Sequence, residues 1–198
     1  MKFSLPNIIS LLRIAIAPVF YVFIISNEPL LIRYACWLFI IGAISDYLDG
    51  WLARNFYGTT NWGKFVDPLA DKIFLAAAFL SFVYLGIIHL WMVIIIIIRD
   101  FGTTFLRVFA VNNKHTIKTS KSAKWKTFLQ MVFICYILIL MYFRDLKIAN
   151  MTSVKINNLI YSYFTYYMML VLTILTLWTA VEYLIQNRHL FGINRNDN

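Results

Sequence analysis

Four aspartates lie close together in the chain, at spacings that suit a shared site. Asp46 and Asp49 are three residues apart, and Asp67 and Asp71 are four residues apart. Residues three or four apart lie on the same face of an α-helix, so each pair presents two carboxylates in one direction. Each pair also stands at the end of an apolar run, with residues 53–65 between the runs. The sequence therefore predicts that the two acidic helix ends converge.

Four neighbouring carboxylates repel one another and take up protons unless cations neutralise their charge. A set of oxygen ligands suits hard divalent cations, and four formal negative charges match two such ions. The sequence thus predicts two divalent cations, Mg²⁺ or Mn²⁺, held by Asp46, Asp49, Asp67 and Asp71. Two other interpretations stay open, namely four separate aspartates that cap helices near a membrane interface, and a structural Ca²⁺ site.

The residues between the acidic pairs favour an anionic substrate. Gly50 follows Asp49 directly, and Gly63 stands four residues before Asp67; small residues at these positions let a bulky group approach the backbone. Arg54 offers a planar fork of donors that matches a phosphate group. Two metal ions can bridge the oxygens of a phosphoanhydride and stabilise both the attacking and the leaving oxygen. We therefore expect a phosphoanhydride substrate.

The overall composition places these residues in a membrane protein. Hydrophobic residues make up 61% of the 198 residues and charged residues only 14%, against about 45–50% and about 25% in soluble domains. That composition excludes an ordinary soluble domain and a disordered chain. The formal net charge of +9 fits basic loops that face an anionic membrane surface. We expect the lipid bilayer as a partner, and no nucleic acid.

Six apolar runs follow one another along the chain, and a transmembrane helix takes roughly 20 residues. In lipid, the backbone must form hydrogen bonds within its own segment, which favours helices. We therefore predict an all-α integral membrane protein with a short N-terminal interfacial helix over residues 3–12, six transmembrane helices and a single membrane-embedded domain over residues 1–198. The six spans are expected at residues 14–25, 31–52, 66–88, 90–111, 128–143 and 159–185.

Basic residues predict the orientation of these spans. Cytoplasmic loops carry an excess of lysine and arginine, and the segment 112–127 holds five lysines. Residues 53–65 and both termini fall on the same predicted side. We expect a multi-pass protein of the cell (inner) membrane whose termini and acidic site face the cytoplasm.

The residues around the aspartates resemble a family signature. The run DYLDGWLAR from Asp46 to Arg54 and the run GKFVDPLAD from Gly63 to Asp71 are similar to the motif D-x2-D-G-x2-A-R-x8-G-x3-D-x3-D of the CDP-alcohol phosphatidyltransferases. Every fixed position and the spacer are present. Near the N-terminus, Asn7 begins N-x-x-S-x-x-R, which resembles the family's N-x-x-T-x-x-R. The resemblance implies the CDP-alcohol phosphotransferase fold and a homodimer.

The resemblance also implies roles for residues of this chain. Asp71 would be the general base that takes the proton from the acceptor hydroxyl, and the four aspartates would hold the metals. The acceptor hydroxyl would attack the β-phosphate of CDP-diacylglycerol, and CMP would leave. The residues that would contact CDP-diacylglycerol are Asn7, Ser10, Gly50, Arg54, Thr60 and Gly63.

The second half of the chain indicates the acceptor alcohol. The run KWKTFLQM from Lys124 to Met131 resembles the G-K-x-K-T-x2-Q-M segment of phosphatidylglycerophosphate synthases within this family, with Ala123 in place of the glycine. A phosphorylated acceptor needs fixed cations, so we expect sn-glycerol 3-phosphate. Its phosphate would be bound by Arg99, Arg107, Lys124 and Lys126. Alternatively, the two arginines pair with Asp100 or extend to lipid headgroups.

Three rival functions share some of these features. The same fold and donor would serve another acceptor, such as inositol phosphate, serine or a second lipid. Membrane prenyltransferases also bind Mg²⁺ through aspartates, but their acidic motifs usually stand on widely separated helices. A small cation transporter would bind its ion through aspartates, yet the sequence shows no inverted repeat of the kind that many transporters contain.

Overall fold

The computed structural model describes residues 5–52, 63–112, 121–144 and 150–187. These residues form seven helices and, within the described ranges, no strands. The helices are α1 (Leu5–Ile25), α2 (Pro29–Leu52), α3 (Gly63–Tyr84), α4 (Leu90–Asn112), α5 (Lys121–Arg144), α6 (Asn150–Ile160) and α7 (Tyr163–Gln186). The all-α prediction is confirmed for this part of the chain.

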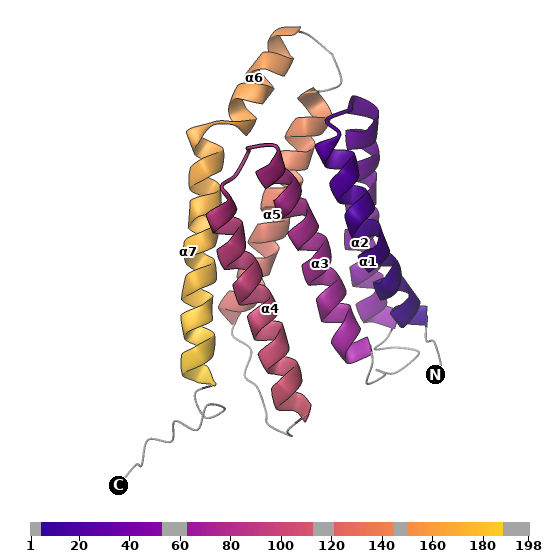
Figure 1. Ribbon diagram of the computed structural model, residues 1–198, viewed down its shortest axis with the longest axis vertical. Helices are drawn as coiled ribbons and strands as arrows, with labels where there is room; N and C mark the ends of the chain where they lie inside the picture. Colours follow the sequence, from indigo (N-terminus) through magenta and orange to yellow (C-terminus); the bar gives the residue numbers. More distant parts are fainter. Residues whose placement is uncertain (1–4, 53–62, 113–120, 145–149, 188–198) are drawn as a thin grey trace.

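The long helices form one bundle, and the short α6 lies at one end of it (Figure 1). α1 packs against α2 and α3, α4 packs against α3 and α7, and α5 contacts α2, α6 and α7. The chain runs up and down through the bundle. The end of α2, the start of α3, the end of α4 and the start of α5 therefore all lie toward the end of the bundle opposite α6 (Figure 1). These are the segments that carry the predicted site.

The outside of the bundle is strongly apolar. Three stretches of the described residues are long and apolar enough to cross a membrane, and a fourth is apolar but shorter. They are Ile8–Ile25, Ser122–Arg144 and Ser153–Gln186, with Pro29–Ser45 as the shorter one. Trp37, Ile98 and Trp178 are more than half exposed, which suits contact with lipid better than contact with water. The chain is a membrane protein, and the count of six spans stays a prediction.

The first helix differs from the sequence-based prediction. α1 runs without interruption from Leu5 to Ile25, so the described residues do not form an interfacial helix that ends near residue 12. The reason lies in Arg13, which precedes the predicted first span. Its side chain is buried and paired inside the bundle, so the helix does not need to break there to keep the charge in water.

The sequence does not predict α6. Most of its residues fall in an expected loop, and its last two fall at the start of the expected sixth span. A turn at Tyr161 and Ser162 separates α6 from α7. The Ser162 side chain caps α7 by accepting a hydrogen bond from the backbone N–H of Thr165. Capping of this kind satisfies an N–H group that the first turn of a helix leaves unpaired.

Aromatic side chains fill the contact among α1, α2 and α3. Phe20, Phe39 and Phe74 are buried, and their ring centroids lie between 5.5 and 6.1 Å apart, a range that favours aromatic pairing. Gly42 permits this packing, because a Cβ atom there would lie 3.0 Å from Cε1 of Phe74. The ring of Phe74 on α3 therefore packs closely against Gly42 of α2, four residues before Asp46.

Adding one methyl group at this contact should destabilise the bundle. We expect Gly42→Ala to displace Phe74, which packs against Phe20 and Phe39, and to lower stability by about 1–3 kcal/mol. Gly102→Ala is the matched control, because a Cβ atom at Gly102 meets nothing within 4 Å. Thermal unfolding in detergent measures both variants. Equal melting midpoints would contradict the close packing of Phe74 against Gly42.

Candidate functional site

The acidic pairs stand at the same end of the bundle. Asp46 and Asp49 lie in the last two turns of α2, and Asp67 and Asp71 lie in the first three turns of α3. Both helix ends lie opposite α6 (Figure 1). Arg54 and Thr60 lie outside the described residues. For a further group, the structure describes the helical backbone but not the side chains: Asn7, Asp46, Asp49, Gly50, Gly63, Asp67 and Arg107.

Asp71 is the member of the four aspartates whose side chain is described, and it is paired with α1. Nη1 of Arg13 donates to Oδ1 of Asp71. The Arg13 side chain is 4% exposed and the Asp71 side chain is 34% exposed, so the guanidinium is buried while the carboxylate is partly open. A planar guanidinium held by the bundle restricts the direction of the carboxylate. The N-terminal motif contains Arg13, but its spacing does not reveal Asp71 as the partner.

A small cavity of about 80 Å³ lies beside this pair. α1, α2, α3 and α5 contribute to its wall, which includes Arg13, Gly42, Asp71, Lys72 and Thr127. The wall thus combines a carboxylate, two cations and a hydroxyl with apolar groups. Such a cavity offers a small polar molecule both a proton acceptor and positive charge. Sequence-predicted Ser10, one helical turn before Arg13, is fully buried and is not part of this wall.

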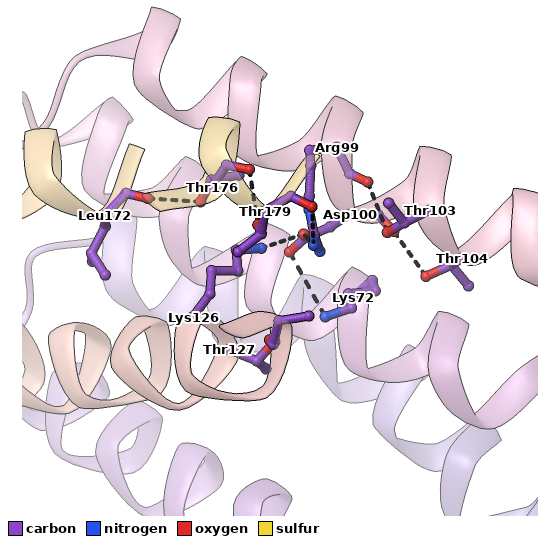
Figure 2. A network of polar contacts seen from close by, with 11 residues as sticks. Lys72, Arg99, Asp100, Thr103, Thr104, Lys126, Thr127, Leu172, Thr176 and Thr179 are labelled. Carbon is purple, nitrogen blue, oxygen red and sulfur yellow. Dashed lines mark hydrogen bonds and ion pairs between the residues drawn. The ribbon is translucent and has the colours of Figure 1, made fainter. Parts of the chain in front are cut away.

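A second group of charges is buried among α3, α4, α5 and α7. Figure 2 shows three cations converging on the carboxylate of Asp100. Nη1 of Arg99 lies 3.2 Å from Oδ1 of Asp100, and Nζ of Lys126 donates to the same oxygen. Nζ of Lys72 lies 3.7 Å from the other oxygen, Oδ2. Because Nη2 of Arg99 also reaches the carbonyl oxygen of Thr179 at 3.5 Å, this group connects four helices.

The residues predicted to bind the acceptor phosphate take different places. Arg99 and Lys126 belong to the group around Asp100, where their side chains are 9% and 1% exposed. Lys124 is exposed on α5. The pairing of Arg99 with Asp100 matches the alternative that the sequence leaves open for it. Sequence reasoning missed Lys72, although a lysine directly after Asp71 in an apolar run is a visible signal.

Removing the charge of Asp100 should destabilise the bundle, because the three cations packed around it would then face a neutral amide. We expect Asp100→Asn to lower stability by about 3–5 kcal/mol, the range for breaking a buried ion pair. Glu28→Gln is the matched control, since Glu28 is exposed in the turn between α1 and α2. Thermal unfolding of the solubilised protein compares the two. An Asp100→Asn midpoint as high as that of Glu28→Gln would show that the carboxylate contributes nothing to stability.

The amino-acid sequence of this chain is similar to those of known proteins. The family model described as CDP-alcohol phosphatidyltransferase matches residues 3–185. A relative from Bacillus subtilis (strain 168), named CDP-diacylglycerol--glycerol-3-phosphate 3-phosphatidyltransferase, is 34% identical, and the match covers 69% of this chain and 77% of the relative. A relative of the same name from Mycoplasma genitalium is 34% identical over 75% of this chain and 61% of its own length, which is less than two-thirds. Since the family model spans nearly all of it, the chain belongs to the CDP-alcohol phosphatidyltransferase family.

Proposed function

We propose that this protein transfers the phosphatidyl group of CDP-diacylglycerol to a hydroxyl of sn-glycerol 3-phosphate, giving phosphatidylglycerophosphate and CMP. The observation that carries the proposal is the position of Asp71, which belongs to the family signature and lines a cavity beside Arg13. Support for the acceptor comes from the two relatives, whose names state this reaction. The positive charge buried around Asp100 also favours a phosphorylated acceptor.

Binding of the donor is assigned to the end of the bundle where α2 finishes and α3 begins. The diphosphate of CDP-diacylglycerol would lie against the acidic helix ends, and its acyl chains would stay among lipids beside the apolar outer surface. Family resemblance and the place of these residues in α1, α2 and α3 support the assignment. The proposed contacts are Asn7, Ser10, Gly50, Arg54, Thr60 and Gly63.

Two divalent cations, Mg²⁺ or Mn²⁺, fit this end of the bundle. Asp46 lies about one helical turn beyond Gly42, and Gly42 lines the same cavity as Asp71; this supports our proposal that the two acidic helix ends share one site. Carboxylate oxygens are the ligands that these hard cations prefer. We propose that Asp46, Asp49, Asp67 and Asp71 hold them. Bound there, the cations would neutralise the diphosphate and the negative charge that develops as CMP leaves.

Asp71 is the proposed general base. Its carboxylate would take the proton from the acceptor hydroxyl. The hydroxyl oxygen forms a bond to the β-phosphorus of the donor, the bond between that phosphorus and the oxygen of CMP breaks, and CMP leaves with the electron pair. Arg13 keeps the carboxylate pointed in one direction. The proposed ligands of the acceptor phosphate remain Arg99, Arg107, Lys124 and Lys126.

We further propose one membrane-embedded domain over residues 1–198, six transmembrane spans and a homodimer. The termini and the site would face the cytoplasm from the cell (inner) membrane. Support for this orientation comes from lysines near the start of α5, at Lys121, Lys124 and Lys126, since cytoplasmic ends of spans are enriched in basic residues. The start of α5 lies at the same end of the bundle as the start of α3 (Figure 1). Family resemblance alone supports the homodimer.

A panel of acceptors tests the proposed reaction. Purified protein with CDP-diacylglycerol and Mn²⁺ should release CMP when sn-glycerol 3-phosphate is added. EDTA should abolish the release, and added Mg²⁺ or Mn²⁺ should restore it. Release with inositol phosphate or serine, but not with glycerol 3-phosphate, would assign the protein to another acceptor. Release that survives complete removal of divalent cations would contradict the metal site.

Replacing the proposed base should stop turnover without removing the donor site. We expect Asp71→Asn to lower kcat for CMP release by about 10²–10⁴-fold, the usual contribution of a general base, while the variant still binds the cytidine nucleotide. Glu28→Gln serves again as the control, because this exposed carboxylate lies in the turn at the other end of α1. If Asp71→Asn released CMP as fast as the control, Asp71 would not be the general base.

A further inference from the structure

Lys72 lies at a position that the family signature does not include. It follows Asp71 directly on α3, and successive residues of a helix point about 100° apart. Asp71 is paired with Arg13 of α1, whereas the ammonium group of Lys72 lies toward Asp100 of α4. Both side chains nevertheless line the same cavity. The cavity therefore has a carboxylate on one part of its wall and a cation on the adjoining part.

The three cations around Asp100 are not equivalent. Lys126 is hydrogen-bonded to Asp100 and is 1% exposed, and Arg99 divides its donors between Asp100 and Thr179. Nζ of Lys72 lies 3.7 Å from Oδ2 of Asp100, which is longer than an N–H···O hydrogen bond. The Lys72 side chain is also the most exposed of the three, at 16%. Among these three cations, Lys72 is the one that lines the cavity.

The group around Asp100 carries more positive than negative charge. Three cations face one carboxylate, which leaves a formal surplus of two positive charges. Buried charge is unfavourable unless it is compensated. An anion that enters the cavity meets this surplus first at Lys72, because Lys72 lines the cavity whereas Arg99 and Lys126 are not part of its wall. A phosphate group suits an ammonium that keeps donors available.

We propose that Lys72 binds the phosphate of the acceptor alcohol and that Asp100 positions Lys72 for this contact. The inference rests on the proposed transfer to a phosphorylated acceptor. With its phosphate at Lys72, a small alcohol such as glycerol 3-phosphate has its hydroxyl end near Asp71, because both side chains line one cavity. An alcohol without a phosphate forfeits the contact. Lys72 thereby contributes to the choice of acceptor.

Steady-state kinetics of CMP release separates this role from a structural one. Lys72→Gln should raise the KM for sn-glycerol 3-phosphate roughly tenfold to hundredfold, the effect of losing a hydrogen bond to a charged group, and should leave the KM for CDP-diacylglycerol near the wild-type value. Lys72→Arg, which keeps the charge, should recover much of the loss. Lys155→Gln is the matched control, because Lys155 is exposed on α6, opposite the site.

The positioning role of Asp100 has its own comparison. Asp100→Asn should raise the same KM without an equal effect on the KM for CDP-diacylglycerol, and Asp100→Glu, which keeps the negative charge, should restore it. If Asp100→Asn lowered the melting midpoint but left both KM values unchanged, Asp100 would have only a structural role. That result would overturn this part of the proposal.

A binding measurement keeps the proposal testable if Lys72→Gln folds but does not turn over. sn-Glycerol 3-phosphate should raise the melting midpoint of the wild-type and Lys155→Gln proteins, as a ligand of the folded state does, and should have little effect on Lys72→Gln. An unchanged KM for glycerol 3-phosphate, or an undiminished thermal shift, would overturn the role of Lys72. If the wild-type protein itself does not use glycerol 3-phosphate, the proposed acceptor fails instead.

Discussion

Charge that is buried inside an apolar bundle must be paired, and this constraint organises the end of the molecule that carries the family signature. An unpaired charge at membrane depth costs about 2.5–3.5 kcal/mol or more. Arg13 pairs with Asp71 between α1 and α3, and the single carboxylate of Asp100 lies against three cations of α3, α4 and α5 and partly compensates them. The two groups adjoin on α3, where Asp71 and Lys72 are neighbours and line the same cavity. The contacts that compensate buried charge therefore also fix the groups that line the cavity.

The proposed reaction depends on this arrangement of charged groups around the cavity. Its donor and its acceptor are both anionic, so they repel each other and must be neutralised separately before they can react. The acidic ends of α2 and α3 are suited to hold cations beside the donor diphosphate. Positive charge held by Asp100 reaches the wall of the cavity at Lys72, next to Asp71. Asp71 belongs to the acidic start of α3 and directly precedes Lys72, and it lines the cavity, where the proposed reaction needs a proton acceptor.

Local patterns made much of this arrangement predictable. The apolar runs indicated helices, and the spacing of the aspartates indicated two acidic helix ends, because both properties belong to neighbouring residues. Contacts between residues far apart in the sequence could not be predicted in this way. Arg13 and Asp71 are 58 positions apart, and Lys126 and Asp100 are 26 positions apart, and nothing in either segment names its partner. The unbroken course of α1 follows from the first of these contacts, so it too depends on tertiary structure that the sequence does not display.

The central claim is that the two acidic helix ends form one site for two divalent cations. A structure determined with Mn²⁺ and CDP-diacylglycerol tests it most directly, through the anomalous scattering of the metal. We expect two metal peaks between the end of α2 and the start of α3, in contact with carboxylates of both acidic pairs and with the donor diphosphate. Acidic pairs that point apart, with the donor bound elsewhere and no metal between them, would contradict the claim.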